Sequence, residues 1–210
     1  MRTKIVSLLI LSFGLFFTAC KENKVERKSY VNPAFSTYIS AFTSGDVSKG
    51  KAIKVVLTQP IDTAKYRIGE ALSDDLFDIS PSIDGIARYS DPYTIEFVPE
   101  HWFNSGEKYS VAFDLKSIIT NTPKDFEEFS FDFHTYELDY NIIVKGFDKN
   151  STYEKVNIAG EVIFTDVIDT TDLKSLITID DVKNVSVHWE EVDEFTYEFT
   201  VENCPRIQNE

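Results

Sequence analysis

The stretch Phe129-Ser130-Phe131-Asp132-Phe133-His134 decides the fold class of this chain, because phenylalanine and polar residues alternate along it without a break. Successive side chains of a β-strand point to opposite faces, so this period predicts a strand with one buried and one solvated face. A shift of the pairing by one residue would turn the whole phenylalanine row into water, which specifies the register. The stretch therefore predicts a β-sheet that covers an apolar core.

The same period recurs upstream of this stretch. We expect strands at 53–57, 93–97 and 109–113, with shorter ones at 38–42, 76–79 and 83–89, and a brief helical turn at 114–119. In the second of these strands, Tyr93, Ile95 and Phe97 should share one face. Turn residues, such as those of Ser44-Gly45-Asp46, separate the strands. Short strands at roughly ten-residue spacing predict an antiparallel β-sandwich.

A second set of β-strands follows this first unit. Its strands are expected at 140–144, 156–164, 185–189 and 195–201, with a capped helical turn at 170–177. The prediction is an all-β fold with two tandem immunoglobulin-like sandwich units, 30–136 and 137–210. Since such a sandwich has about seven strands, we expect the second unit to be incomplete and the chain to be a fragment. The alternative is a small variant of the sandwich.

The N-terminus has the features of an export signal. Arg2 and Lys4 precede an apolar run at 5–17, and Ala19 stands directly before Cys20. The stretch Phe16-Phe17-Thr18-Ala19-Cys20 resembles a bacterial lipobox, although Phe17 replaces the usual leucine. This resemblance implies that residues 1–19 are a lipoprotein signal peptide and that Cys20 carries acyl chains, which would anchor the chain in a membrane. The alternative is an ordinary signal peptide that contains a cysteine.

The polar residues 20–29 have no apolar period and are expected to form a tether. The chain has 35 acidic and 21 basic residues, a net charge of −14, which argues against nucleic acid as a partner. An anionic membrane repels such a protein, so the lipid must hold it there. We expect a location in the cell envelope, at the outer membrane or the periplasmic face.

No catalytic, cofactor-binding or metal-binding residue is assigned, and we do not expect an enzyme. The histidines His101, His134 and His188 lack metal-ligand spacing. For the acidic group Asp74, Asp75 and Asp78, a calcium site is an alternative interpretation. The acidic run of Glu190, Glu191, Asp193 and Glu194 is expected to be a solvated hairpin tip, and the alternative is the carboxylate pair of a glycosidase. Trp189 continues the alternation of a predicted strand, so its side chain should lie in the core. The alternative for Trp102, which precedes a turn, is a platform on which a sugar stacks. Cys204 is expected to be a small hydrophobic residue of the core or a residue of the interdomain junction.

The order of several motifs resembles the N-terminal region of bacterial alpha-2-macroglobulin-like lipoproteins of the Bacteroidota type. In the first unit these motifs are Tyr38–Gly45, Ile53–Leu57, Leu76–Pro81, Thr94–Pro99, Ser105–Tyr109 and Phe129–Phe133. In the second unit they are Ile158–Val162, Asp166–Ile168 and Val201–Asn203. The resemblance implies macroglobulin-type domains and a part in trapping proteases. The family's thioester motif, C-x-E-Q, is absent because Pro205 and Arg206 follow Cys204. The alternative is a standalone surface lipoprotein whose immunoglobulin-like domains bind glycans or proteins.

Overall fold

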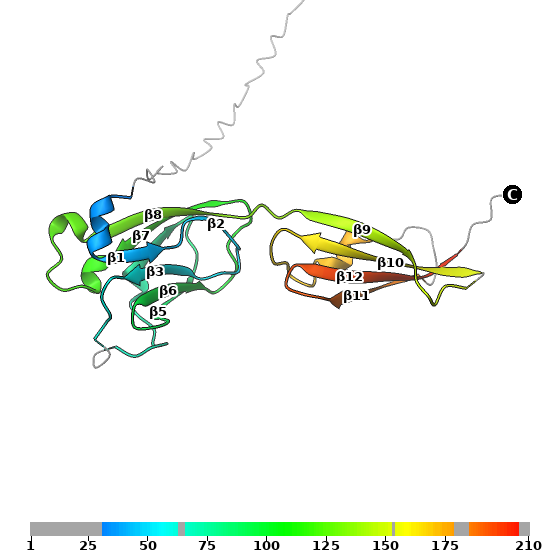
Figure 1. Cartoon of the computed structure of the whole chain (residues 1–210), viewed down its shortest axis with the longest axis horizontal. Coiled ribbons are helices and arrows are strands. Elements are labelled where there is room, and N and C mark those ends of the chain that lie inside the picture. The colour runs from blue at the N-terminus through cyan, green and yellow to red at the C-terminus, as the bar shows by residue number, and fades with distance from the viewer. Residues whose placement is uncertain (1–30, 63–65, 153, 179–184, 206–210) are drawn as a thin grey trace, which may run out of the picture.

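The strands predicted from alternating residues form three four-stranded sheets, so the expected all-β fold is confirmed (Figure 1). The structure is a computed structural model that describes residues 31–62, 66–152, 154–178 and 185–205. The predicted signal peptide at 1–19, the tether at 20–29 and the anchor residue Cys20 lie outside the described residues. None of the helices within the described ranges has the length and apolar character needed to cross a membrane.

The first unit, residues 31–136, contains two sheets that face each other. One sheet has the order β1-β3-β6-β5 and the other has the order β2-β8-β7-β4. The strands are β1 (Ile39–Phe42), β2 (Gly45–Val47), β3 (Ile53–Leu57), β4 (Phe77–Ser80), β5 (Gly85–Tyr89), β6 (Thr94–Pro99), β7 (Lys108–Asp114) and β8 (Glu128–Thr135). Short 3-10 helices connect some of them: η1 (Pro33–Thr37), η2 (Asp74–Leu76), η3 (Leu115–Ser117) and η4 (Lys124–Phe126).

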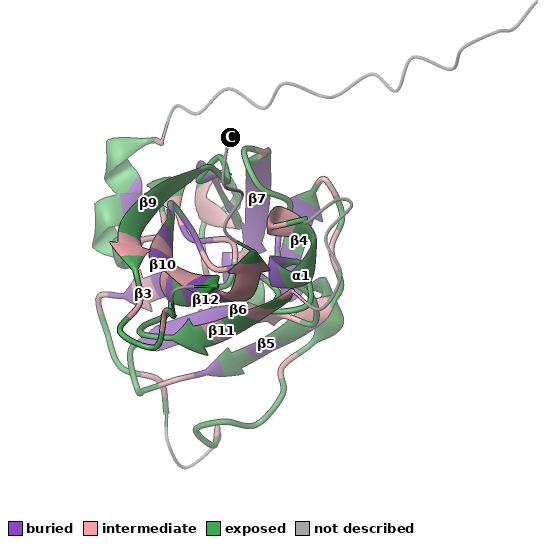
Figure 2. Cartoon of the chain, turned by 90° about the vertical axis from the view of Figure 1, so that its right-hand side faces the viewer, coloured by how far each residue is buried: buried purple, intermediate pink, exposed green. Residues whose placement is uncertain are grey.

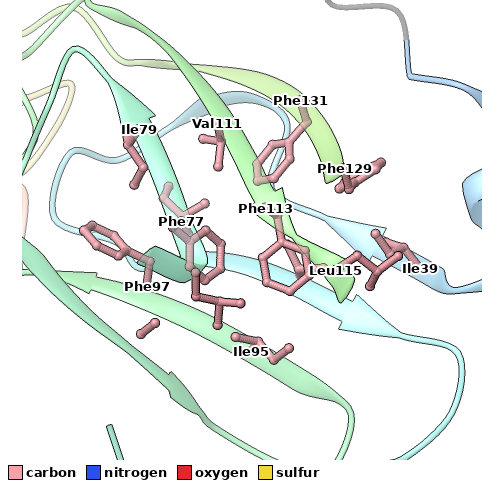
Figure 3. Close-up of a cluster of buried hydrophobic side chains, with 14 of the residues drawn as sticks. Ile39, Phe77, Ile79, Ile95, Phe97, Val111, Phe113, Leu115, Phe129 and Phe131 are labelled. Atoms are coloured by element: carbon pink, nitrogen blue, oxygen red, sulfur yellow. The ribbon is translucent and has the colours of Figure 1, made fainter. Parts of the chain in front are cut away.

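The core between these sheets is rich in phenylalanine (Figure 3). Phe129, Phe131 and Phe133 of β8 are all buried, as their alternation predicts. Phe77 of β4 packs on Phe113 of β7 with ring centroids 5.0 Å apart, a spacing at which aromatic pairs attract. The alternating row of β8 is therefore the inner face of a two-layer core.

The structure differs from the sequence-based expectations at three places in the first unit. Tyr93 is 45% exposed because it lies in the turn before β6, where the carboxylate of Asp91 accepts its backbone N–H at 2.8 Å. The expected turn around Gly45 contains β2, which pairs with β8 in parallel, so this sheet is mixed. Ser110 and Ala112 of β7 are buried although they alternate with the core residues of this strand; they lie between β8 and β4, which pair with β7 on its two sides.

The second unit, residues 137–205, contains one antiparallel sheet with the order β11-β12-β10-β9. Its strands are β9 (Tyr140–Phe147), β10 (Lys155–Phe164), β11 (Ser186–Glu191) and β12 (Thr196–Pro205). The expected helical turn is α1 (Leu173–Leu176), and Leu173 packs with Ile168 against Phe199 and Val162 of the sheet. A loop with one helical turn thus covers the inner face of this sheet where the first unit has a second sheet.

Candidate functional site at the joint between the units

The chain passes from the first unit to the second through a linker, residues 136–139, that is held from both sides. The backbone N–H of Tyr136 donates to the carbonyl of Val47 at 3.0 Å, in the first unit. The hydroxyl of Thr165, in the second unit, donates to the carbonyl of Glu137 at 2.7 Å. At the far end of the linker, the backbone N–H of Asp139 donates to the same Thr165 hydroxyl oxygen at 2.8 Å. Hydrogen bonds at both ends thus restrict the backbone dihedrals of the linker, so it is not a free hinge.

A second connection between the units is made by the Asp166 latch, which consists of Asp166, Ser48 and Lys49. The hydroxyl of Ser48 donates to Asp166 Oδ1 at 2.5 Å, and the backbone N–H of Lys49 donates to Asp166 Oδ2 at 2.8 Å. The N–H of Val167 also donates to Oδ1, at 2.8 Å. Asp166 is 0% exposed. A buried carboxylate needs such donors to replace its lost hydration, and two of these donors belong to the first unit.

The loop after β2 brings the two donors to the carboxylate. Ser48 is itself buried, and its carbonyl accepts the N–H of Lys51 at 3.1 Å, which closes a tight turn. Within this turn, a Cβ atom at Gly50 would lie 3.1 Å from Val167 Cγ2 and 3.5 Å from Trp102 Nε1. Glycine therefore lets the loop approach the second unit closely.

Trp102 and two lysines surround the latch at the surface. The Lys49 ammonium lies 5.3 Å from the centroid of the Trp102 ring, within the range of a cation–π contact, and Trp102 is 46% exposed. Lys51 forms an exposed ion pair with Glu194 at 3.7 Å, which contributes little because water screens it. The joint has a buried polar centre and a solvated rim.

The hydrogen bonds of Asp166 orient the two units relative to each other. Both oxygens of Asp166 accept hydrogen bonds from groups that hold the units together. Its partners are a serine hydroxyl and two backbone amides. This arrangement fixes the angle between the units.

The other residues singled out from the sequence lie elsewhere and are not brought together. The three histidines are exposed, and His188 lies 3.2 Å from Glu202 across neighbouring strands. The acidic group on η2 and β4 (Asp74, Asp75 and Asp78) is exposed. Among the described residues, no three His, Cys, Asp or Glu side chains form a group that could hold a metal ion.

The acidic run at 190–194 lies at the β11–β12 hairpin. Asp193 Oδ1 accepts the N–H groups of Phe195 and Thr196, both at 2.8 Å. These hydrogen bonds lower the pKa of Asp193, the one to Phe195 contributing most. The run is thus a hairpin tip, as expected, and Glu194 on it reaches Lys51 of the first unit.

Trp189 and Cys204 belong to the core of the second unit. The Trp189 ring lies 5.6 Å from that of Phe199, and both Trp189 and Cys204 pack partly buried against the core cluster. Cys204 pairs with Val156, at the end of the sheet opposite to the joint. Its interpretation as a small hydrophobe therefore fits the structure, and a place at the joint does not.

Two open depressions lie on the first unit. The larger, of about 800 Å³, is lined by apolar residues such as Phe97 and by four charged residues, Asp74, Asp84, Arg88 and Glu100. Arg88 is engaged with Glu96 at 2.9 Å, so its charge is already compensated. The smaller, of about 470 Å³, is lined by Tyr38, Pro60 and Ile119 among others. The carboxylates of the larger depression belong to exposed residues, so this lining does not assign a ligand.

The Asp166 latch has no signature in the sequence that would predict it. Ser48 and Asp166 are 118 positions apart, and each reads as an ordinary loop residue by itself. The signals that the sequence does contain are the place of Asp166, two residues beyond the strand predicted at 156–164, and its position at the start of the motif Asp166–Ile168.

Comparison with known proteins identifies no family. No family model and no curated protein matches the chain. An L,D-transpeptidase from Mycobacterium tuberculosis H37Rv is similar in structure at 9% identity with a TM-score of 0.34, over 75% of this chain and 60% of that one. L,D-transpeptidase 3 from the same species gives 9% identity and a TM-score of 0.31, over 75% of this chain and 59% of its own. This chain thus spans less than two thirds of these structures, and likenesses this weak carry no argument for an activity.

Proposed function

We propose that the chain is a non-enzymatic, lipid-anchored module of the cell envelope, in which two β-units form a fixed arm. In this proposal the arm is the N-terminal part of an alpha-2-macroglobulin-like inhibitor that traps proteases. The observation that carries the proposal is the joint, because the buried Asp166 latch and the linker both hold the second unit against the first. An arm that positions other parts of a protein at a distance from a membrane needs such rigidity.

The sequence of the N-terminus and the order of the strand motifs support the proposal. Cys20 stands where a lipobox has its acylated cysteine, and the residues after it are polar. Several motifs of the resemblance fall on strands, among them Thr94–Pro99, which is β6. The chain lacks the C-x-E-Q motif, so it would supply the arm and not the capture of a protease.

The lipid anchor is tested by changing Cys20→Ser and fractionating cells labelled with palmitate. We expect the wild-type chain in the membrane fraction with label, and the variant either released or retained as an uncleaved precursor without label. Cys204→Ser is the matched control and should behave like the wild type, because Cys204 lies at the second unit's core. A cleaved, unlabelled Cys20→Ser protein that stays fully in membranes would refute the anchor.

The inhibitor part is tested separately, with membranes from cells that make the chain and from cells that lack its gene. A trapped protease is expected to lose activity on a large protein substrate and to keep activity on a small peptide. We expect this selective loss only with membranes from cells that have the gene. Equal activity in both preparations would refute the inhibitor while leaving the anchor in place.

A second candidate function is binding of glycans or proteins by a standalone lipoprotein, and the exposed Trp102 favours it. One face of its ring is already occupied by the Lys49 ammonium, which leaves less of the ring for a sugar. A glycan array with the purified chain tests this candidate. Binding that is lost in Trp102→Ala and kept in Tyr93→Ala, an aromatic residue of similar exposure, would support it; an array without any signal would remove it.

A further inference from the structure

The outer edge of β9 is an open sheet edge with apolar side chains. β9 is the last strand in the order β11-β12-β10-β9, and no described strand pairs with its other side. Tyr140, Ile142, Ile143 and Val144 are 49%, 41%, 39% and 64% exposed. Figure 2 shows β9 as exposed along most of its length. Such an edge presents unpaired backbone groups together with apolar surface, which favours pairing with another strand.

The opposite edge strand of the same sheet, β11, is protected against pairing with another strand by its charged side chains. β11 carries Glu190 and Glu191 beside His188, and charged side chains on an edge strand discourage pairing. β9 has a single charged residue, Lys145. The contrast lies within one sheet, so it marks β9 as the edge that is open to a partner.

The apolar side chains of β9 lie on both faces of the strand. Ile142 is opposite Val162, and Val144 is opposite Gly160, which places both on the inner face of the sheet. Ile143 is opposite Glu161, on the outer face. A strand added to this edge would therefore cover apolar surface on both of its sides.

The backbone groups that point away from β10 follow from the alternation of an antiparallel ladder. The carbonyl of Asp139 accepts the N–H of Thr165 at 3.0 Å, so the backbone carbonyl of Asp139 points toward the β10 side of the strand. Every second residue from there does the same, and the residues between them, Ile142 and Val144 included, direct N–H and C=O outward. The regular part ends after Val144, where the register shifts and Gly146 adopts φ 117°.

We propose that this edge binds β9 of a second copy of the chain, antiparallel and with two-fold symmetry centred on Ile142. Ile142 then pairs with Ile142 of the other copy, and Tyr140 pairs with Val144. Because all these residues have outward backbone groups, the central pairs are the hydrogen-bonded type of an antiparallel ladder. The two sheets join into one continuous sheet, and a self-complementary contact of this kind closes as a dimer.

Matching side chains at the two ends of the strand select a second copy as the occupant. In the register centred on Ile142, Asp139 of one copy lies opposite Lys145 of the other, and the symmetry repeats this pair at the far end. Lys145 holds Glu161 at 2.7 Å and Glu198 at 2.6 Å, and an ammonium has a third N–H to give. The chain has a net charge of −14, so two copies repel each other elsewhere. Because Lys145 already holds two carboxylates, its contribution to the contact is the third N–H, which donates to Asp139 of the other copy at both ends of an apolar centre.

A cysteine cross-link tests the register. In the full chain with Cys20→Ser and Cys204→Ser, Ile142→Cys should form a disulfide-linked dimer under mild oxidation, since Cα atoms of a hydrogen-bonded pair are about 5.5 Å apart. The matched control is Val192→Cys, 57% exposed beyond the opposite edge strand, which should stay monomeric. Equal cross-linking of both variants, or a cross-link from Ile142→Cys to a different protein in cells, would overturn the proposal.

Sedimentation of variants without new cysteines tests the contact independently. The wild type and Val192→Lys should sediment as dimers, and Val144→Lys should sediment as a folded monomer with unchanged circular dichroism. Asp139→Lys and Lys145→Asp should each lose the dimer, because like charges then face each other, and an equal mixture of the two should regain it. A wild-type chain that remains monomeric at micromolar concentration would overturn the proposal.

Discussion

Replacing Asp166 with asparagine should loosen the joint while keeping the shape of the side chain. If the amide nitrogen replaces Oδ2, it faces the N–H of Lys49, and two donors then point at each other. If it replaces Oδ1, the hydroxyl hydrogen of Ser48 loses its acceptor. A hydrogen bond to a charged group contributes about 1.5 to 3 kcal/mol, and a buried donor left without a partner costs about 1 to 3 kcal/mol. We therefore expect the free energy of unfolding of the less stable unit to fall by about 2 to 3 kcal/mol.

Urea unfolding followed by tryptophan fluorescence measures this loss, because Trp102 lies at the joint and Trp189 in the second unit. The matched control is Asp169→Asn. The Asp169 carboxylate is exposed and accepts only from Thr171, within its own loop, among the described residues. A double-mutant cycle with Ser48→Ala isolates the contact between the units, with an expected coupling of about 1 to 2 kcal/mol.

Small-angle X-ray scattering provides the second readout. The Asp166→Asn variant should show a broader distribution of distances than the wild type, because the units would then vary in their relative orientation. If the variant unfolds within about 0.5 kcal/mol of the wild type, the size of an ordinary surface substitution, and its scattering is unchanged, the latch does not hold the joint.

Two further predictions concern single buried positions. Tyr89 is 0% exposed, its hydroxyl has no hydrogen-bond partner among the described residues, and burial raises its pKa from 10.0 to about 12. A raised pKa means that the stabilisation by the neutral phenol is complete below pH 10.0 and is lost as the pH rises through about 12. Tyr89→Phe should therefore flatten the fall in unfolding free energy over this range, and urea titrations that show the same slope in both proteins would contradict this. Gly160→Ala should lower the free energy of unfolding by about 1 to 3 kcal/mol, because its Cβ would overlap the Phe199 ring and lie 2.7 Å from the Ile143 carbonyl oxygen. Ala159→Ser is the control, and equal melting temperatures of the two variants would refute the clash.

The strands could be predicted wherever burial alternates along a single segment. Phe129, Phe131 and Phe133 show the period of the sheet because one side of β8 faces the core. Tyr93 fits the same period but lies in a turn, where the carboxylate of Asp91, two residues earlier, accepts its backbone N–H. β2 could not be predicted, because it is short and polar and is a strand only through its pairing with β8.

The joint could not be predicted for a related reason. Its energy comes from contacts between loops that are distant in sequence, and neither Ser48 nor Asp166 has a local pattern that indicates burial. The hairpin tip at Asp193 could be predicted, because its hydrogen bonds are formed within a few residues. Hydrogen bonds between residues close in sequence can be predicted from the sequence, whereas a contact between two units depends on how both units have folded.

The parallel pairing of β2 with β8 has a mechanical consequence. Val47 lies opposite Thr135, and directly beyond this pair one strand continues into the latch and the other into the linker. The second unit is thus mounted at two adjacent points on one sheet of the first unit. A single mounting point would allow rotation about the backbone, whereas two resist torsion, so a twisting force on the second unit must first break the hydrogen bonds of Asp166.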